Sequence, residues 1–188
     1  MLQKIGADVI VSSGVEDIKK AKKLILPGVG AFDNGMKNLN NSGLLSILND
    51  RVLKEKIPVL GICLGMQLFT RKSEEGTLSG LGWIDGEAIR FRVDPVQKDL
   101  KIPHMGWDTV AMCKQSALFD DMYQEPRFYF VHSYHVACND KNDILTKTSY
   151  GYDFVSSLQR ENILGVQFHP EKSHKFGMKL LKNFVDRF

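Results

Sequence analysis

The chain has 188 residues, of which 43% are hydrophobic and 25% are charged, and this composition is typical of a globular protein with a single domain, residues 1–188. The formal net charge of +3 and the even spread of lysines argue against nucleic-acid binding, and no apolar run is long enough to span a bilayer. Three cysteines do not make a disulfide framework, so we expect a reducing, cytoplasmic location.

The first third of the chain alternates apolar runs with helical patterns. Residues 1–7 have the pattern of a last helical turn capped by Gly6. The elements expected next are a strand at 7–13, a helix at 15–22, a strand at 23–26, a helix at 33–56, a strand at 58–62 and a helix at 64–71. Continuously apolar strands separated by helices predict an α/β fold with an open, mostly parallel sheet and helices on both faces.

The remainder of the chain has a different sequence pattern, with short expected strands and frequent turn signals. This pattern predicts antiparallel additions at one edge of the parallel sheet. Residues 127–136 are expected to form one strand, and residues 154–168 two strands joined by a turn at 160–162. The last fourteen residues, 175–188, have the apolar spacing of an amphipathic helix.

The segment Gly61-Ile62-Cys63-Leu64-Gly65 has the form of a nucleophile elbow, in which a nucleophile lies between glycines at a strand-to-helix turn. The glycines allow a tight turn and close approach of neighbouring backbone. A cysteine at the start of a helix is placed to react as a thiolate, and the N–H of Leu64 is placed to bind an oxyanion. A buried structural cysteine is the alternative interpretation.

A cysteine nucleophile needs a base, and the base needs an orienting group. His169 and Glu171 follow an apolar run, and Pro170 between them disfavours helix at His169. An extended backbone would point both side chains to the same side, so that Glu171 could hold one imidazole nitrogen while the other faces Cys63.

Other candidate sites are weaker. The glycine-rich turn in residues 24–32 could supply a second oxyanion donor, and it is no phosphate loop because no Gly-Lys-Ser/Thr follows. His132 and His135 differ by three on the expected strand and should face opposite sides, so strand packing or substrate contact is favoured over metal binding. Cys113 and Cys138 are interpreted as structural.

Three segments together resemble the triad (class I) glutamine amidotransferases: PGVGAF at 27–32, GICLGMQLF at 61–69 and GVQFHPEKS at 165–173. PHMGWD at 103–108 and FYFVHSYHV at 128–136 are similar to the glutaminase subunits of imidazole glycerol phosphate synthase. The resemblance implies an enzyme of histidine biosynthesis that hydrolyses glutamine to glutamate and ammonia without a cofactor. It also implies a heterodimer with a (βα)8-barrel cyclase, which receives the ammonia.

The resemblance also implies a role for individual residues. Cys63, His169 and Glu171 would form the catalytic triad, and the backbone at Val29 and Leu64 the oxyanion hole. The residues that match glutamine-binding positions are Gly30, Gln67, Glu75, Ser133 and Tyr134. Trp107 and Lys172 match the face that docks on the cyclase.

The chain departs from the family pattern in two places. The family usually opens with a strand that ends in a glycine-containing turn, so the expected fold lacks its first strand. Asp108 stands where the family usually has asparagine. Three alternatives therefore stay open: a paralogue supplying ammonia for sugar amidination in surface-polysaccharide biosynthesis, a truncated subunit that binds its partner without catalysis, and a cysteine-elbow hydrolase without ammonia transfer.

Overall fold

The computed structural model describes residues 1–92 and 100–188. Its helices are α1 (Val15–Lys20), α2 (Phe32–Asn41), α3 (Leu45–Asn49), α4 (Leu64–Leu68) and α5 (His174–Arg187). Its strands are β1 (Leu24–Gly28), β2 (Val59–Cys63), β3 (Lys72–Ser73), β4 (Gly86–Arg90), β5 (His104–Thr109), β6 (Ala111–Met112), β7 (Arg127–His132), β8 (Tyr134–Cys138), β9 (Ile144–Tyr150), β10 (Tyr152–Arg160) and β11 (Ile163–Val166). Short helical turns occupy Leu2–Ile5, Asp50–Lys54, Ala117–Phe119, Lys141–Asp143 and Pro170–Lys172.

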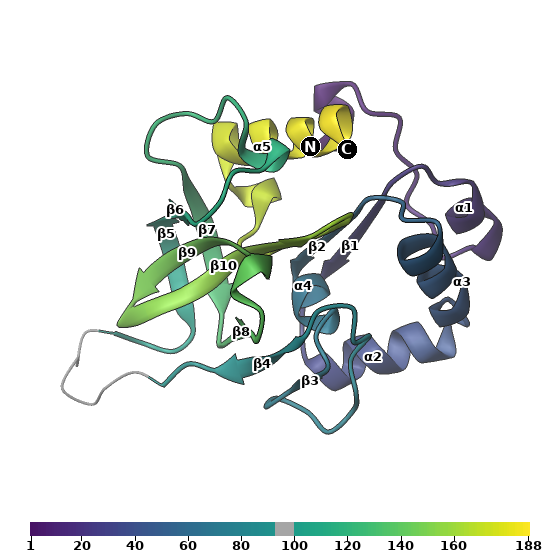
Figure 1. The fold of residues 1–188 in the computed structure, drawn as a ribbon, viewed down its shortest axis with the longest axis horizontal. Helices are drawn as coiled ribbons and strands as arrows, with labels where there is room; N and C mark the ends of the chain where they lie inside the picture. Colours follow the sequence, from purple (N-terminus) through teal and green to yellow (C-terminus); the bar gives the residue numbers. More distant parts are fainter. Residues whose placement is uncertain (93–99) are drawn as a thin grey trace.

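The main sheet runs in the order β1-β2-β11-β10-β8-β4-β3, and β9 pairs with both β10 and β6. β1, β2 and β11 are parallel, whereas β10, β8 and β4 continue the sheet in antiparallel pairs. A separate antiparallel pair, β5-β7, lies beside this extension (Figure 1). The α/β fold with antiparallel additions that the sequence predicts is confirmed.

The hydrophobic core has two parts, one on each face of the parallel strands. Along β2, Val59 packs into the first part with α1 to α4, whereas Leu60 and Ile62 pack into the second part with α5. Because successive side chains on a strand point to opposite faces, a continuously apolar strand is expected where both faces are covered. Figure 1 shows α1, α2 and α3 grouped together, with α5 on another side of the sheet.

The single helix expected over residues 33–56 is wrong, because the structure divides it. α2 ends at Asn41 and α3 begins at Leu45, and Gly43 between them has a φ of 69°. A left-handed backbone angle cannot continue a right-handed helix, so the glycine turns the chain before the apolar spacing resumes.

Two expected strands also differ from the structure. Residues 7–13 form no strand, and Ile10 and Val11 are exposed. A strand requires backbone pairing, which β-branched composition alone does not supply. The strand expected over 127–136 is divided at Ser133 into β7, which pairs with β5, and β8, which pairs with β10 and β4.

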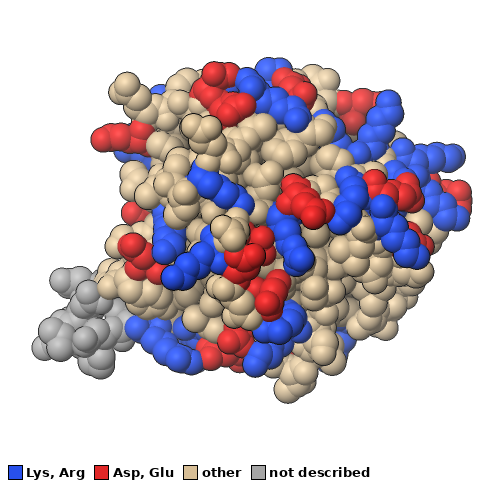
Figure 2. Space-filling view, in the orientation of Figure 1, with Lys and Arg blue, Asp and Glu red and all other residues tan. Residues whose placement is uncertain are grey.

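The helices expected at 15–22 and 175–188, and the two strands joined at 160–162, are present close to their expected bounds. In the described ranges, no helix has both the length and the apolar character needed to cross a bilayer. Basic and acidic side chains are interspersed over the face shown in Figure 2. Such mixing gives this face no single-sign field.

Candidate active site

Cys63, the last residue of β2, lies at the sharp turn into α4, with φ 54° and ψ −112°. A non-glycine residue rarely adopts a positive φ, and such strain is typical of an elbow that lifts a nucleophile out of a sheet. A side chain at Gly65 would place its Cβ 1.8 Å from the Leu26 carbonyl oxygen, and one at Gly61 would lie 2.6 Å from Phe69. Both glycines that flank Cys63 are therefore required by close packing.

His169 and Glu171 are in direct contact, as the sequence predicts. The His169 Nδ1 atom lies 2.7 Å from Glu171 Oε1, and the imidazole is almost completely buried. The predicted geometry is wrong in one respect: Glu171 lies in the short helical turn Pro170–Lys172, and only His169 is extended. This turn still brings the carboxylate back to the ring.

The protonation of His169 depends on both neighbours. Burial acts to lower the pKa of His169, but hydrogen bonds to Cys63 and Glu171 and the charges of both groups outweigh it and raise the pKa to about 9. Burial acts to raise the pKa of Glu171, but the hydrogen bonds from His169 and from the backbone, together with the charges of His169 and Lys172, outweigh it and lower the pKa. The arrangement favours an imidazolium held between a sulfur atom and a carboxylate.

The turn that follows β1 lies next to the nucleophile. β1 pairs with β2 so that Gly28 is opposite Cys63, and a Cβ on Gly28 would lie 2.9 Å from the Gly65 nitrogen. Val29 is exposed, and Gly30 has a φ of 94°. The backbone of this turn and the N-terminus of α4 are therefore brought together at one edge of the parallel sheet.

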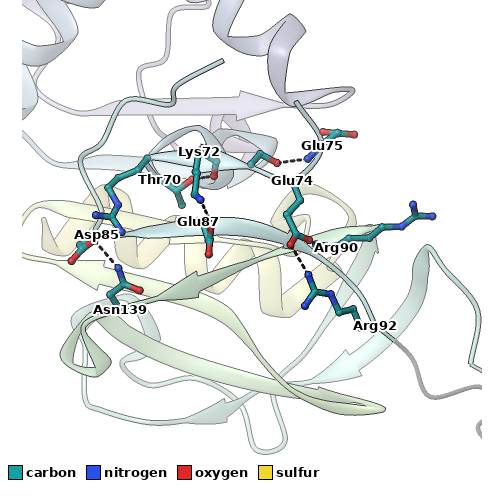
Figure 3. Close-up of polar contacts among 11 residues, drawn as sticks. Thr70, Lys72, Glu74, Glu75, Asp85, Glu87, Arg90, Arg92 and Asn139 are labelled. Atoms are coloured by element: carbon teal, nitrogen blue, oxygen red, sulfur yellow. Dashed lines mark hydrogen bonds and ion pairs between the residues drawn. The ribbon is translucent and has the colours of Figure 1, made fainter. Parts of the chain in front are cut away.

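Glu75 contacts the same turn from the other side. Its Oε2 atom accepts a hydrogen bond from the Phe32 N–H at 2.8 Å, and its own N–H donates to Ser73 Oγ at 3.1 Å. The neighbouring Glu74 pairs with Arg92, so that the loop after β3 is held to the chain that follows β4 (Figure 3). The structure thus places the Glu75 carboxylate against Phe32, which follows Gly30 by two residues at the end of the glycine-rich turn.

Gln67 and Tyr134 are joined directly. The buried Gln67 side chain donates from Nε2 to the Tyr134 carbonyl at 3.0 Å and to Gln167 Oε1 at 3.1 Å. Ser133 lies between β7 and β8, and its carbonyl accepts from the Phe91 N–H. The segment of Ser133 and Tyr134 is therefore connected to α4, the helix that begins just after Cys63.

Two residues that the sequence reasoning missed complete the surroundings of the triad. Gln167 is fully buried, and its Nε2 lies 3.6 Å from Cys63 Sγ. Ser173 is fully buried as well, and its hydroxyl donates to the His169 carbonyl at 2.6 Å and accepts from the Tyr129 N–H at 3.0 Å. The available signal was a polar residue in the apolar run before His169, since buried polar groups need partners.

Trp107 and Lys172 both lie next to Tyr129. The Trp107 ring is stacked on His174 with centroids 5.4 Å apart, and the Lys172 ammonium lies 5.6 Å from the centre of the Tyr129 ring. We call Trp107, Tyr129, Lys172 and His174 the aromatic patch. The Trp107 side chain is partly exposed, so the patch is open to solvent.

His132 and His135 do not face opposite sides as expected, because they lie on different strands. Both rings pack against Phe91, with centroid distances of 5.1 and 4.7 Å. His135 is held by the Tyr152 hydroxyl at 2.9 Å, and burial lowers its pKa to about 4. In the described part of the chain, no group of three or more histidine, cysteine and acidic side chains is arranged to hold a metal ion.

Comparison with known proteins places this site in a family. The family profile described as "Glutamine amidotransferase class-I" matches residues 2–188. The chain is 54% identical, over 98% of its length and 90% of the relative, to imidazole glycerol phosphate synthase subunit HisH 2 of Methanococcus maripaludis. It is 48% identical, over 99% of its length and 91% of the relative, to the subunit HisH 2 of Pseudomonas aeruginosa.

Solved structures agree at the level of the fold. A crystal structure of a glutamine amidotransferase aligns with a TM-score of 0.70 at 16% identity, covering 98% of this chain and 88% of that one. The glutaminase domain of CTPS from Trypanosoma brucei, solved with acivicin, aligns with a TM-score of 0.60 at 15% identity, covering 100% and 84% of the two chains. The chain belongs to the class-I glutamine amidotransferase family.

Proposed function

We propose that the chain is the glutaminase subunit of a cytoplasmic imidazole glycerol phosphate synthase in histidine biosynthesis. Its single domain, residues 1–188, would pair with a (βα)8-barrel cyclase subunit of the HisF type in a heterodimer. The observation that carries the proposal is the elbow geometry of Cys63 combined with the 2.7 Å contact between His169 and Glu171. The identity to relatives named HisH supports the choice of pathway.

In the first half of the reaction, the Cys63 sulfur attacks the side-chain amide carbon of glutamine. The carbonyl oxygen becomes an oxyanion, for which the N–H groups of Val29 and Leu64 are the proposed donors. The tetrahedral intermediate then collapses, the carbon–nitrogen bond breaks, and the nitrogen takes a proton from the His169 imidazolium. Ammonia leaves, and the glutamyl group remains on Cys63 as a thioester.

In the second half, neutral His169 accepts a proton from water as the water oxygen attacks the thioester carbon. The carbon–sulfur bond breaks, glutamate is released, and the Cys63 sulfur regains its starting form beside the His169 imidazolium. Glu171 keeps the ring oriented and favours the imidazolium in both halves, which is the role expected of the third member of a triad.

Glutamine is proposed to lie between the turn that carries Gly30 and the segment of Ser133 and Tyr134. Gln67 supports that segment through the Tyr134 carbonyl. Glu75 is the proposed partner of the α-ammonium group, because it is a carboxylate beside the glycine-rich turn. An ammonium ligand would then compete with the Phe32 N–H for this carboxylate.

The aromatic patch is the proposed docking face for the cyclase. Aromatic side chains are enriched at the centres of protein interfaces, and Trp107 and Tyr129 carry apolar area beside the cation of Lys172. Lys172 follows Glu171 directly, so a partner that contacts the patch would lie close to the triad. Ammonia would then pass into the partner without release to solvent.

The test is the rate of glutamate release from glutamine, with and without a histidine-pathway cyclase and its nucleotide ligand. We expect strong stimulation by the cyclase, and no release from a Cys63→Ala variant in the same mixture. Circular dichroism of each sample would show that the chain is folded.

The second candidate function, ammonia supply for sugar amidination, is tested with the same protein. It predicts glutaminase activity with a sugar-amidinating partner and no response to the histidine-pathway cyclase. A folded chain that releases no glutamate with either partner would instead favour a non-catalytic binding subunit.

A further inference from the structure

A continuous line of hydrogen bonds connects the exposed end of β5 with the nucleophile. Asp108 Oδ2 lies 3.1 Å from His104 Nε2, and His104 Nδ1 lies 3.1 Å from His132 Nε2. His132 Nδ1 lies 2.8 Å from the Tyr134 carbonyl, which also accepts from Gln67. From Gln67 the line continues through Gln167 to Cys63 Sγ.

The direction of each bond in the histidine part of this line is fixed by chemistry. A carbonyl oxygen can only accept, so the hydrogen between His132 and Tyr134 belongs to His132 Nδ1. In a neutral ring the other nitrogen, His132 Nε2, is then an acceptor, and His104 Nδ1 must donate to it. His104 Nε2 would then be an acceptor that faces the Asp108 carboxylate, which is also an acceptor.

The line is therefore one hydrogen short when both rings are neutral. Three contacts, from Tyr134 to His132, from His132 to His104 and from His104 to Asp108, need three hydrogens, and two neutral imidazoles supply two. Leaving two acceptors against each other at a nearly buried site is costly, so the complete line contains one additional proton. Asp108 is partly exposed, which lets this proton exchange with solvent.

We propose that Asp108 is a positioning residue for glutamine hydrolysis, and that it acts through a proton shared with His104 to fix His132 and the Tyr134 carbonyl. The inference rests on the proposed glutaminase function and on the placement of Tyr134 at the glutamine pocket. With the proton present, the backbone after Ser133 is held by His132 and Gln67 together. Without it, Asp108 repels the His104 lone pair, and the support from His132 is weakened.

The surroundings of the two histidine rings determine the pH at which the proton is lost. Burial lowers the pKa of His104, and the hydrogen bond and charge of Asp108 oppose this effect. Burial also lowers the pKa of His132, and the neighbouring His104, His135 and His169 lower it further. Tyr150 from β9 stacks on His104 with centroids 4.1 Å apart, and its hydroxyl is occupied by the backbone of Lys101. Burial outweighs Asp108, so the pKa of His104 lies below its ordinary 6.5, and the proton is lost as the pH rises through the acidic side of that value.

The first test is the KM for glutamine of the chain in complex with its cyclase, measured from about pH 5 to about pH 8. In the unaltered chain we expect KM to rise roughly fivefold over this range, the size expected from the loss of one hydrogen bond. Asp108→Asn supplies a permanent N–H to His104 Nε2, so its KM should stay low and flat. Asp108→Ala removes both the hydrogen bond and the repulsion, so its KM should not change with pH over this range.

The control is Asp153→Asn, the same chemical change at an exposed position of β10, which should keep the pH dependence of the unaltered chain. A merely structural role for Asp108 would alter stability without removing the pH dependence in Asp108→Asn. The proposal is overturned if Asp108→Asn retains the same rise in KM as the unaltered chain.

The second test does not require glutaminase activity, so it separates this inference from the proposed function. Nitrogen-15 NMR of the histidine rings reports which nitrogens carry hydrogen. We expect His132 to carry hydrogen on Nδ1, and His104 to carry hydrogen on both nitrogens at low pH and to lose one as the pH rises. In Asp108→Asn, His104 should carry one hydrogen throughout. A His104 ring with the same single hydrogen at every pH in both proteins would contradict the shared proton.

Discussion

Cys63 combines a left-handed backbone angle with a position between two glycines, and the glycines are as important as the sulfur. A Cβ at Gly65 would collide with the Leu26 carbonyl, and one at Gly61 with the ring of Phe69. The neighbouring strand and helix leave no space for a methyl group at either position. The chemistry of the site therefore depends on residues that have no reactive group.

Gly65→Ala should be strongly destabilising, because its Cβ would meet the Leu26 carbonyl oxygen at 1.8 Å and backbone must move. We expect a loss of about 3 kcal/mol in the free energy of unfolding, measured by urea denaturation. Gly35→Ala is the control, because its Cβ would meet only the flexible ends of Leu68 at 3.1 Å and Leu64 at 3.3 Å, and alanine favours helix. Equal stability of the two variants would contradict the packing argument.

The raised pKa of His169 predicts how activity depends on pH. Because this pKa is raised from an ordinary 6.5 to about 9, the proton stabilises the folded state fully below about pH 6.5, and this contribution is lost as the pH rises through about 9. In the proposed reaction the imidazolium also protonates the nitrogen that leaves as ammonia, so kcat should fall as the pH rises through about 9.

Glu171→Gln checks this assignment, since it removes one of the groups that raise the pKa of His169. The fall in kcat should move to lower pH in this variant, in a series of rates measured with saturating glutamine and cyclase. An unshifted profile would mean that another group controls the alkaline limb.

Gln167→Met should lower kcat by about tenfold, because it removes the donor to Cys63 Sγ while keeping a similar volume. Gln159→Met, on β10, is the matched control and should retain full activity. Steady-state rates of glutamate release compare the two. Identical rates would exclude a contribution of the Gln167 amide to the reactivity of the sulfur.

At the scale of elements, the site is assembled from the ends of β1, β2 and β11 and from the loop after β3. Parallel strands place their carboxyl ends at the same edge, which brings Val29, Cys63 and His169 together from distant parts of the sequence. The loop after β3 is held by Asp33 of α2, which accepts from the Thr77 and Leu78 N–H groups at 3.0 Å each.

Asp33→Ala should raise the KM for glutamine several-fold, because the loop that carries Glu75 loses two backbone anchors. Asp50→Ala is the control, since Asp50 forms only an exposed pair with Lys54 in the described structure. Glutaminase kinetics at a fixed cyclase concentration measure the difference. An unchanged KM in Asp33→Ala would show that this loop does not position glutamine.

How much of the structure can be predicted from the sequence also depends on the element. The order of strand, turn and helix around Cys63 follows from local chemistry, and so does the pairing of His169 with Glu171. The division of 33–56 at Gly43 and of 127–136 at Ser133 depends on which distant strand or helix each half contacts. The same applies to residues 7–13. Their β-branched composition favours a strand, but no strand in the described part of the chain pairs with them. The role of Gln167 could not be read from the sequence because its partner, Cys63, is distant in the chain.

At the scale of the whole molecule, residues of the aromatic patch are direct neighbours along the chain of Glu171 and Asp108. Lys172 follows Glu171, and Trp107 lies beside Asp108 on β5. A partner bound at the patch would therefore contact segments that lead directly to His169 and to Tyr134. We therefore expect binding of a cyclase at the patch to alter the positions of residues at the glutamine site.

Trp107→Ala should weaken binding of the cyclase by about tenfold or more, since buried tryptophans are frequent centres of interface affinity. Isothermal titration with the cyclase measures the change. Tyr123→Ala is the control, because Tyr123 is an exposed aromatic residue beside Lys175 and lies outside the aromatic patch. Equal weakening by both variants would place the interface elsewhere.

The most direct measurement of the central claim is the mass of the intact chain after a rapid acid quench during turnover of glutamine. The account predicts a glutamyl adduct on Cys63, present only while glutamine remains, and absent from Cys63→Ala. His169→Asn should accumulate less of it, because the departing ammonia lacks its proton donor. An active chain that never carries an adduct on Cys63, or an active Cys63→Ala variant, would contradict the account.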